Sequence, residues 1–326
     1  MKVIVIGLGS MGRRRIRLLK QYDSAIQITG VDSNEERAKK VAEEYGIHYA
    51  LSIDNAAQGR SVICAFVCTS PLSHSKIIQD LLIRGIHVFT EINLVPDGYE
   101  KIISLSEKEK RVLFLSSTFL YRKDIQHIMS QVHKQKVNYT YHTGQYLPDW
   151  HPWEDYRKFF VGNSRTNGCR EILAIELPWI VKCFGKIKRF EVLKDKMSSL
   201  DINYDDNYML LVEHENGTKG LIAVDVVARK AMRRLEIYNE ELQIFWAGTP
   251  KSLNIFNLDT KEMKHIKTYE TIQKDERYCD NIIENAYMDE IVAFFEEVNY
   301  NDTKNKFHSF EKDWEIIQLI DQIESR

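Results

Sequence analysis

The chain has 326 residues, a length that suits two domains better than a single core. Its 44% hydrophobic and 28% charged residues are typical of a folded globular protein and exclude a disordered chain. The formal net charge of −2 excludes a global basic field, so we expect no nucleic-acid partner.

The cysteines and the apolar runs bear on the cellular compartment. The five cysteines include no CxxC pair, so the sequence predicts neither a disulfide framework nor a metal site. Met1 leads directly into a strand-like run, and no apolar stretch has the length of a membrane span. We therefore expect a cytoplasmic protein that does not associate with membranes.

The first residues of the chain match a dinucleotide-binding pattern. An apolar β-branched run, a glycine turn and an amphipathic stretch follow one another at residues 2–6, 7–12 and 13–21. Gly7 permits the tight turn, Gly9 lets the backbone approach a pyrophosphate, and Gly12 lets the helix pack close to the strand. The helix start, with Ser10 and Met11, presents N–H groups and the positive end of its dipole to the phosphates. This strand–turn–helix context predicts a cofactor site.

A carboxylate stands where a ribose-binding group is expected. Asp32 ends the second strand pattern, about 20 residues past the last glycine of the turn. A carboxylate accepts the ribose hydroxyls and repels a 2′-phosphate, so Asp32 favours NAD over NADP. Arg37 is the nearest arginine after it, and we expect it over the adenine. The first helix carries arginines at residues 13, 14, 15 and 17. They form either a solvated face or contacts with the cofactor phosphates.

Strand and helix patterns alternate through the first third of the chain. The strands are expected at residues 2–6, 26–31, 47–50, 61–68, 86–90 and 112–116. The helices are expected at residues 13–21, 35–45, 71–84 and 98–110. The run at 61–68 is apolar almost throughout, as in a parallel strand buried on both faces. The fold class is therefore α/β, with a doubly wound parallel Rossmann sheet over residues 1–120.

The pattern changes after residue 120. Strand-like runs follow one another there with few helices between them, and Asn216-Gly217 is a hairpin signal. Successive strands predict an open, largely antiparallel sheet in an α+β domain over residues 121–326. We expect this domain to bind substrate and to form oligomers, and its C-terminal helices to pack back.

At this point the chain resembles the glucose–fructose oxidoreductase/inositol dehydrogenase (Gfo/Idh/MocA) family over essentially its whole length. The glycine turn, residues 69–74 (Thr-Ser-Pro-Leu-Ser-His), residues 87–94 (His-Val-Phe-Thr-Glu-Ile-Asn-Leu) and the last helices carry the resemblance. It implies a nicotinamide cofactor and a sugar, cyclitol or nucleotide-sugar substrate. It also implies further cofactor-side residues, which are Thr69, Ser70, Pro71, His74, Glu91 and Asn93. Glu91 is expected beside the nicotinamide ribose, and Asn93 near the carboxamide or a substrate hydroxyl.

The chain departs from the family at its catalytic positions. Ile92 stands where the family motif has lysine, and an alignment of the helix after Gly168 places Ile172 and Glu176 at the usual aspartate and histidine. Two alternatives follow. In the first, chemistry persists, with Glu176 as first candidate acid/base and His151 as second. In the second, the protein is a non-catalytic dinucleotide/sugar sensor or partner subunit.

Aromatic and polar residues gather in two neighbouring segments of the second domain. Aromatic faces pack on the C–H faces of sugars, while arginine reads hydroxyls or a phosphate. The candidate substrate-binding residues are Asn93 of the first domain and, in the second, Tyr146, Trp150, Trp153, Arg165 and Arg170. We favour an NAD-dependent oxidoreductase of carbohydrate or surface-glycan precursor metabolism. The resemblance and the apolar strands near residues 210–212 and 221–227 further predict a homodimer or homotetramer.

Overall fold

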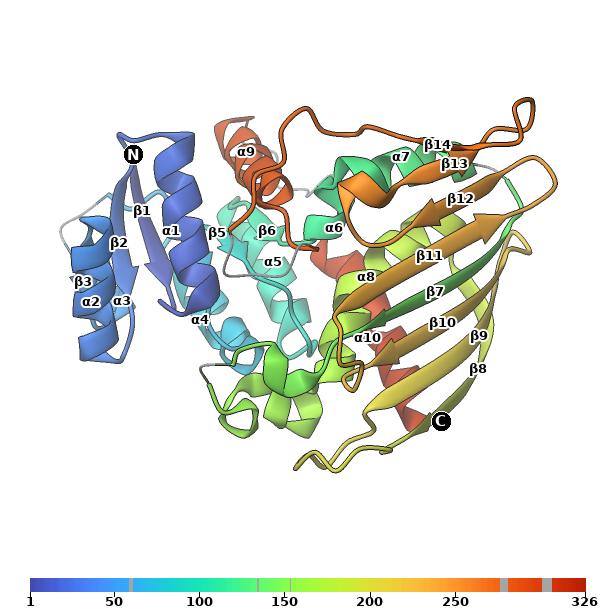
Figure 1. The fold of residues 1–326 in the computed structure, drawn as a ribbon. Helices are drawn as coiled ribbons and strands as arrows, with labels where there is room; N and C mark the ends of the chain where they lie inside the picture. The colour runs from blue at the N-terminus through green and yellow to red at the C-terminus, as the bar shows by residue number, and fades with distance from the viewer. Residues whose placement is uncertain (59–60, 134, 153, 276–280, 301–306) are drawn as a thin grey trace. The chain divides into compact units, whose positions relative to one another are not determined.

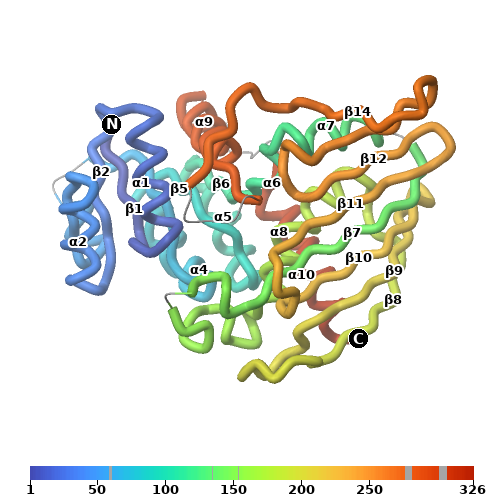
Figure 2. The backbone as a smooth tube through the Cα atoms, viewed as in Figure 1, coloured from blue at the N-terminus to red at the C-terminus, as the bar shows by residue number. Residues whose placement is uncertain are grey.

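The computed structural model describes residues 1–58, 61–133, 135–152, 154–275, 281–300 and 307–326, and its chain divides into two units (Figures 1 and 2). The first comprises Met1–Ser117 and Tyr287–Glu315, and the second Thr118–Ala286 and Ile316–Arg326. Residues 287–315, which the sequence analysis assigns to the second domain, thus group with the first unit.

The described part of the first unit contains a six-stranded parallel sheet, in the order β3-β2-β1-β4-β5-β6. Its strands β1 to β6 are Lys2–Ile6, Gln27–Val31, His48–Ala50, Cys64–Val67, His87–Thr90 and Leu113–Leu115. The helices α1 to α5 are Ser10–Tyr22, Glu35–Tyr45, Ile53–Ala57, Pro71–Ile83 and Tyr99–Glu109. Every residue of β4 is buried, as expected of a central strand covered on both faces. The doubly wound parallel sheet predicted from the sequence is confirmed.

A helix from the C-terminal part of the chain completes the core of this unit. Phe66, Phe89 and Phe114 stack in series on β4, β5 and β6, with ring centroids 4.8 and 5.1 Å apart. Phe294, on helix α9 (Glu284–Tyr300), meets all three rings edge-on at 5.3 to 5.8 Å. Aromatic pairs prefer this geometry, so α9 is anchored to the sheet by specific ring contacts.

The described part of the second unit contains an eight-stranded sheet, in the order β14-β13-β12-β11-β7-β10-β9-β8. Its strands β7 to β14 are Asn138–Gly144, Ile187–Asp195, Asn207–His214, Lys219–Asp225, Met232–Tyr238, Gln243–Trp246, Asn254–Phe256 and Met263–His265. Among the described strand pairs of this second sheet, only that of β7 with β10 is parallel. The predicted open, largely antiparallel sheet is confirmed, as is the hairpin turn, where Gly217 has φ +83°.

Helices cover one face of this second sheet. Helices α6, α7, α8 and α10 span Thr118–Tyr121, Lys123–Val132, Gly168–Phe184 and Phe310–Ser325, and residues 316–325 of α10 belong to this unit. Tyr139 of β7 stacks on Phe184 of α8 at 4.1 Å, and Tyr141 meets Trp179 edge-on at 5.4 Å. Within the described ranges, no helix combines the length and the apolar character that crossing a bilayer requires.

A buried histidine gives the first unit a pH-dependent stability. His87 Nδ1, at the start of β5, accepts the Val112 N–H at 2.9 Å, and burial lowers the pKa of His87 to about 4. Folding favours the neutral form of His87. Its contribution to the free energy of unfolding is therefore complete above the ordinary pKa of 6.5 and is lost as the pH falls toward 4. The limit of this loss is about 3 kcal/mol.

We expect His87→Asn, whose amide oxygen can accept the same N–H, to flatten the pH dependence of the free energy of unfolding between pH 6.5 and 4. Urea unfolding across that range measures it. An unchanged slope would show that His87 is not the titrating group.

Candidate functional site

The glycine turn has the geometry that a dinucleotide requires. Gly7 has φ +87°, and a Cβ on Gly12 would lie 2.0 Å from the Gly7 carbonyl oxygen, so helix α1 begins directly against the end of β1. A Cβ on Gly9 would meet nothing within 4 Å, which leaves open space over the turn. Gly9 is the N-cap of α1 and supplies no capping side chain to Ser10 and Met11. The backbone at this helix start therefore suits a pyrophosphate.

Asp32 lies beside this turn. Its Oδ2 accepts the Leu8 N–H at 3.0 Å and its Oδ1 accepts the Asn34 N–H at 2.9 Å, while Arg37 Nη1 stands 3.4 Å from Oδ2. The carboxylate is 8% exposed, and the Arg37 side chain is half-exposed. A carboxylate has about four acceptor positions, so capacity for ribose hydroxyls remains.

The start of α4 packs against the same turn. A Cβ on Gly7 would lie 2.7 Å from the Cys68 carbonyl oxygen and 2.9 Å from Thr69 Cγ2. Ser70 is the N-cap of α4 and Pro71 its first residue. The turns after β1 and β4 therefore meet where the strand order of the sheet reverses, which is the ligand position in doubly wound folds. The structure thus brings these predicted cofactor residues together.

His74 and Asn93 bind each other. His74 Nε2 lies 2.9 Å from the Thr69 carbonyl oxygen and Nδ1 lies 2.7 Å from Asn93 Oδ1, and burial lowers the pKa of His74. A neutral imidazole that donates from Nε2 accepts at Nδ1, which favours the Asn93 amide in its flipped orientation. Asn93 is only 3% exposed, because its amide is buried beside His74, and its donation to the carboxamide or to a substrate hydroxyl stays a prediction.

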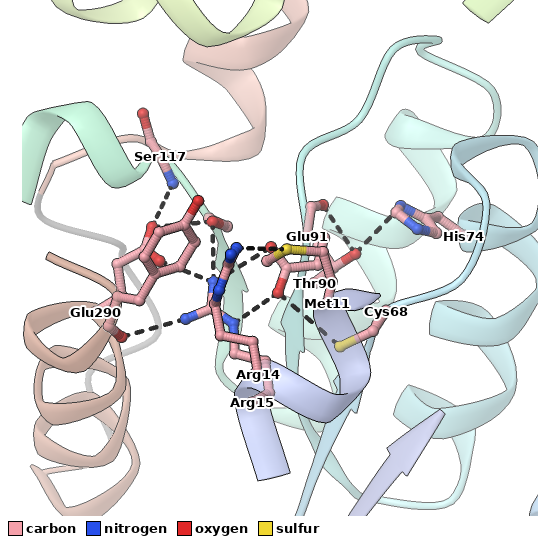
Figure 3. A network of polar contacts seen from close by, with 11 residues as sticks. Met11, Arg14, Arg15, Cys68, His74, Thr90, Glu91, Ser117 and Glu290 are labelled. Carbon is pink, nitrogen blue, oxygen red and sulfur yellow. Dashed lines mark hydrogen bonds and ion pairs between the residues drawn. The ribbon is translucent and has the colours of Figure 1, made fainter. Parts of the chain in front are cut away.

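Glu91 belongs to a buried ion-pair network (Figure 3). Arg15 Nε lies 2.6 Å from Glu91 Oε1, and Arg15 Nη2 lies 2.8 Å from Glu290 Oε2. Glu290 Oε1 also accepts the Ser116 hydroxyl and the Ser117 N–H, at 2.9 and 2.7 Å. Burial alone would lower the pKa of Arg15, but the charges of Glu91 and Glu290 raise it.

This network changes the interpretation of two sequence features. Arg14 and Arg15 are 3% and 0% exposed, so a solvated face does not describe these two residues. Arg15 lies one helical turn from Gly12 and from Leu19 on the buried face of α1, a spacing that could have indicated its burial. The Glu91 carboxylate is held by Arg15, so its proximity to the nicotinamide ribose stays a prediction.

Glu176, in the second unit, is fully engaged inside the protein. Its Oε2 accepts the Tyr141 hydroxyl and the Trp179 indole N–H, both at 2.7 Å, and its Oε1 lies 2.8 Å from Arg233 Nε. The residue is 1% exposed. A carboxylate that is excluded from solvent and already accepts from three donors is poorly placed to reach a substrate hydroxyl, which argues against Glu176 as the acid/base group.

Arg233 is the group that the sequence analysis missed. It stands on β11, where the inward-facing positions alternate, and Leu235 and Ile237 of the same strand are fully buried. This period of two could have indicated that Arg233 points inward. Its guanidinium lies 4.9 Å from the Phe119 ring centroid.

The segment after β7 carries the second catalytic candidate. His151 is half-buried, and its ring stands 4.8 Å from that of Phe159. Tyr146 and Trp150 are also half-buried, at either end of the 3₁₀ turn Leu147–Asp149. Trp153 lies outside the described residues. This segment carries an imidazole and two aromatic side chains, and its role in sugar binding stays a prediction.

The two predicted substrate arginines lie in different environments. Arg170 ties α8 to α10, because its guanidinium pairs with Asp321 at 2.6 Å and with Glu324. The Arg170 side chain is 5% exposed, and its predicted role in substrate binding stays a prediction. Arg165 is exposed on the 3₁₀ turn Ser164–Thr166.

The comparisons agree with the geometry of the first unit. Residues 1–116 match the model of the GFO_IDH_MocA family, described as an oxidoreductase family with an NAD-binding Rossmann fold. This match assigns residues 1–116 to the NAD-binding Rossmann domain of that family. No curated protein matches the chain by sequence.

Solved structures extend the likeness of the fold to the whole chain. UDP-N-acetylglucosamine 3-dehydrogenase GnnA from Acidithiobacillus ferrooxidans has a TM-score of 0.79 and 16% identity, over 100% of this chain and 97% of its own. Levoglucosan dehydrogenase in complex with NADH has a TM-score of 0.79 and 13% identity, over 99% and 95%. GenD2 from gentamicin A biosynthesis, in complex with NAD, has a TM-score of 0.75 and 15% identity, over 98% and 92%. These TM-scores show a shared fold, and at such low identities the likeness shows the fold alone.

The glycine turn offers a matched pair of variants. Gly9 has φ −74°, which alanine adopts freely, so we expect Gly9→Ala to fold normally and to weaken NADH binding at least tenfold, because its methyl group fills the pyrophosphate position. Gly12→Ala would clash with the Gly7 carbonyl and should lower the melting temperature as well. Fluorescence titration with NADH and thermal unfolding measure both effects. Wild-type affinity in Gly9→Ala would contradict this placement of the cofactor.

Proposed function

We propose that this protein is an NAD-dependent oxidoreductase that transfers a hydride between the nicotinamide and a hydroxyl or ketone of a sugar or nucleotide sugar. The observation that carries the proposal is the open space over Gly9, with the Asp32 carboxylate hydrogen-bonded to the Leu8 N–H of the same turn. NAD, when bound, supplies the hydride acceptor or donor. In this proposal Asp32 receives the ribose hydroxyls, and its charge disfavours the 2′-phosphate of NADP.

Two lines of support favour a carbohydrate substrate. Two of the similar structures are named for sugar or nucleotide-sugar dehydrogenases, namely GnnA and levoglucosan dehydrogenase. In this chain, Tyr146 and Trp150 are half-buried aromatic residues in one segment, a composition that suits the C–H faces of a sugar ring. A role in carbohydrate or surface-glycan precursor metabolism and a cytoplasmic location remain predictions from the sequence.

We assign the acid/base role to His151. Oxidation of a hydroxyl needs a base that takes the O–H proton while the hydride leaves, and imidazole has an ordinary pKa near the working range. Glu176, the first candidate from the sequence, instead holds Arg233 in place through its 2.8 Å ion pair. In this assignment Glu176 is a positioning residue.

One observation favours a second function, that of a non-catalytic dinucleotide/sugar sensor or partner subunit. Ile92 stands where the family motif has lysine, and the Glu176 carboxylate is occupied by three donors. An apolar side chain at residue 92 offers no cation to a substrate hydroxyl. This alternative predicts NAD binding without turnover.

We expect His151→Gln to lower kcat at least 100-fold while NADH binding persists, because proton transfer contributes about 10²–10⁴ to such reactions. The measurement is NADH absorbance against a panel of sugars and nucleotide sugars. His133→Gln, on an exposed histidine, is the matched control and should leave kcat unchanged.

Two results would decide against this assignment. If a folded, NADH-binding Glu176→Gln variant loses turnover and His151→Gln keeps it, Glu176 is the acid/base group. If the wild-type protein binds NADH and turns over no member of the panel, the sensor function is favoured.

We further propose that the uncovered face of the second sheet joins copies of this chain into a homodimer or homotetramer. Leu193, Met209, Leu211 and Leu221 are 54–79% exposed on three neighbouring strands, where Leu193 pairs with Met209 and Leu211 with Leu221. Such a continuous apolar patch is typical of an interaction surface.

We expect the wild-type protein to sediment as a dimer or tetramer at micromolar concentration, and Leu211→Lys/Leu221→Lys to sediment as a monomer, because the two charges oppose burial of the patch. Leu258→Lys, on an exposed leucine outside this face, is the control. A monomeric wild-type protein would refute the proposal.

A further inference from the structure

The connection between β10 and β11 carries two cations without an acidic partner. This basic loop, residues 226–231, contains Arg229 and Lys230, and both side chains are exposed. Across the described residues, neither one forms a hydrogen bond or an ion pair with a carboxylate, whereas Arg157, Arg170, Arg189 and Arg233 each have one. Two positive charges therefore keep their donors available to a ligand.

The start of the basic loop is built by Asp225. Its Oδ1 accepts the N–H groups of Val227 and Ala228 at 2.9 and 2.7 Å, and its Oδ2 lies 2.6 Å from His142 Nε2. A Cβ on Gly144 would lie 2.5 Å from Asp225 Oδ2, so only glycine leaves room for this carboxylate. Because both oxygens are engaged, Asp225 fixes the loop and does not neutralise Arg229.

The basic loop is also joined to the segment that carries the aromatic residues. The Tyr146 N–H donates to the Ala228 carbonyl at 2.7 Å, and the Leu147 N–H donates to the Val226 carbonyl at 2.9 Å. The Arg229 guanidinium lies 4.0 Å from the centroid of the Tyr146 ring. This cation–π contact holds the guanidinium against an aromatic face while its N–H edges stay open.

We propose that Arg229 and Lys230 form a phosphate-binding subsite for a phosphorylated substrate, with Tyr146 orienting the guanidinium. The inference rests on the proposed function and specifies its substrate class, because a neutral sugar makes no use of two unpaired cations. A guanidinium binds phosphate oxygens through paired N–H donors, and an ammonium adds a second charge. The phosphate belongs to a nucleoside diphosphate sugar or to a sugar monophosphate.

The test is calorimetric titration of the NADH-saturated protein, so that the glycine turn is already filled. The probes are UDP, glucose 6-phosphate, glucuronate and glucose. We expect UDP or glucose 6-phosphate to bind, and Arg229→Ala/Lys230→Ala to weaken that binding at least about tenfold. Stronger binding of UDP identifies a nucleoside diphosphate, and stronger binding of glucose 6-phosphate a sugar monophosphate.

The control is Arg234→Ala, which removes an exposed charge on the neighbouring strand β11, outside the basic loop, and should leave UDP binding unchanged. Equal NADH affinity and melting temperature in the double variant show that it is folded. Binding of glucuronate alone, unchanged phosphate binding in the double variant, or no phosphate binding to the NADH complex each overturns the inference and spares the proposed function. Failure of NADH to bind overturns both.

Discussion

The first unit depends on one buried guanidinium. Arg15 is fully buried, and its ion pairs with Glu91 and Glu290 join α1, the end of β5 and α9, while the Ser116 and Ser117 contacts of Glu290 add the end of β6 (Figure 3). Removing the arginine, or removing its glutamate partners, would leave an uncompensated buried charge and lower the free energy of unfolding by about 3–5 kcal/mol. The helix that carries Arg15 is the helix that begins at the glycine turn. The position of the turn relative to the sheet therefore follows from this network.

The geometry of the glycine turn and the order of the first sheet were predictable because their determinants are local. Gly7, Gly9 and Gly12 act through backbone geometry within one strand–turn–helix, and the doubly wound order of the sheet follows from alternating strands and helices. Asp32 is placed by the end of its strand. Each of these features depends on a short stretch of sequence.

The partners of the remaining polar side chains were not predictable. Glu176 meets Tyr141 and Arg233, and Arg170 meets Asp321, all from elements distant in sequence. An alignment places Glu176 at a catalytic position, but only the fold shows that its carboxylate is buried and already accepts from three donors. Residue type and spacing thus identify a candidate group, while its availability to a substrate depends on tertiary contacts.

The central claim is that the glycine turn and Asp32 bind NAD, and a direct comparison of two cofactors tests it. Equilibrium titration of the wild-type protein with NADH and with NADPH, at equal ionic strength, measures both dissociation constants. The account predicts that NADH binds at least about tenfold more tightly, because the Asp32 carboxylate repels a 2′-phosphate. Tighter binding of NADPH, or no binding of either cofactor, would contradict it.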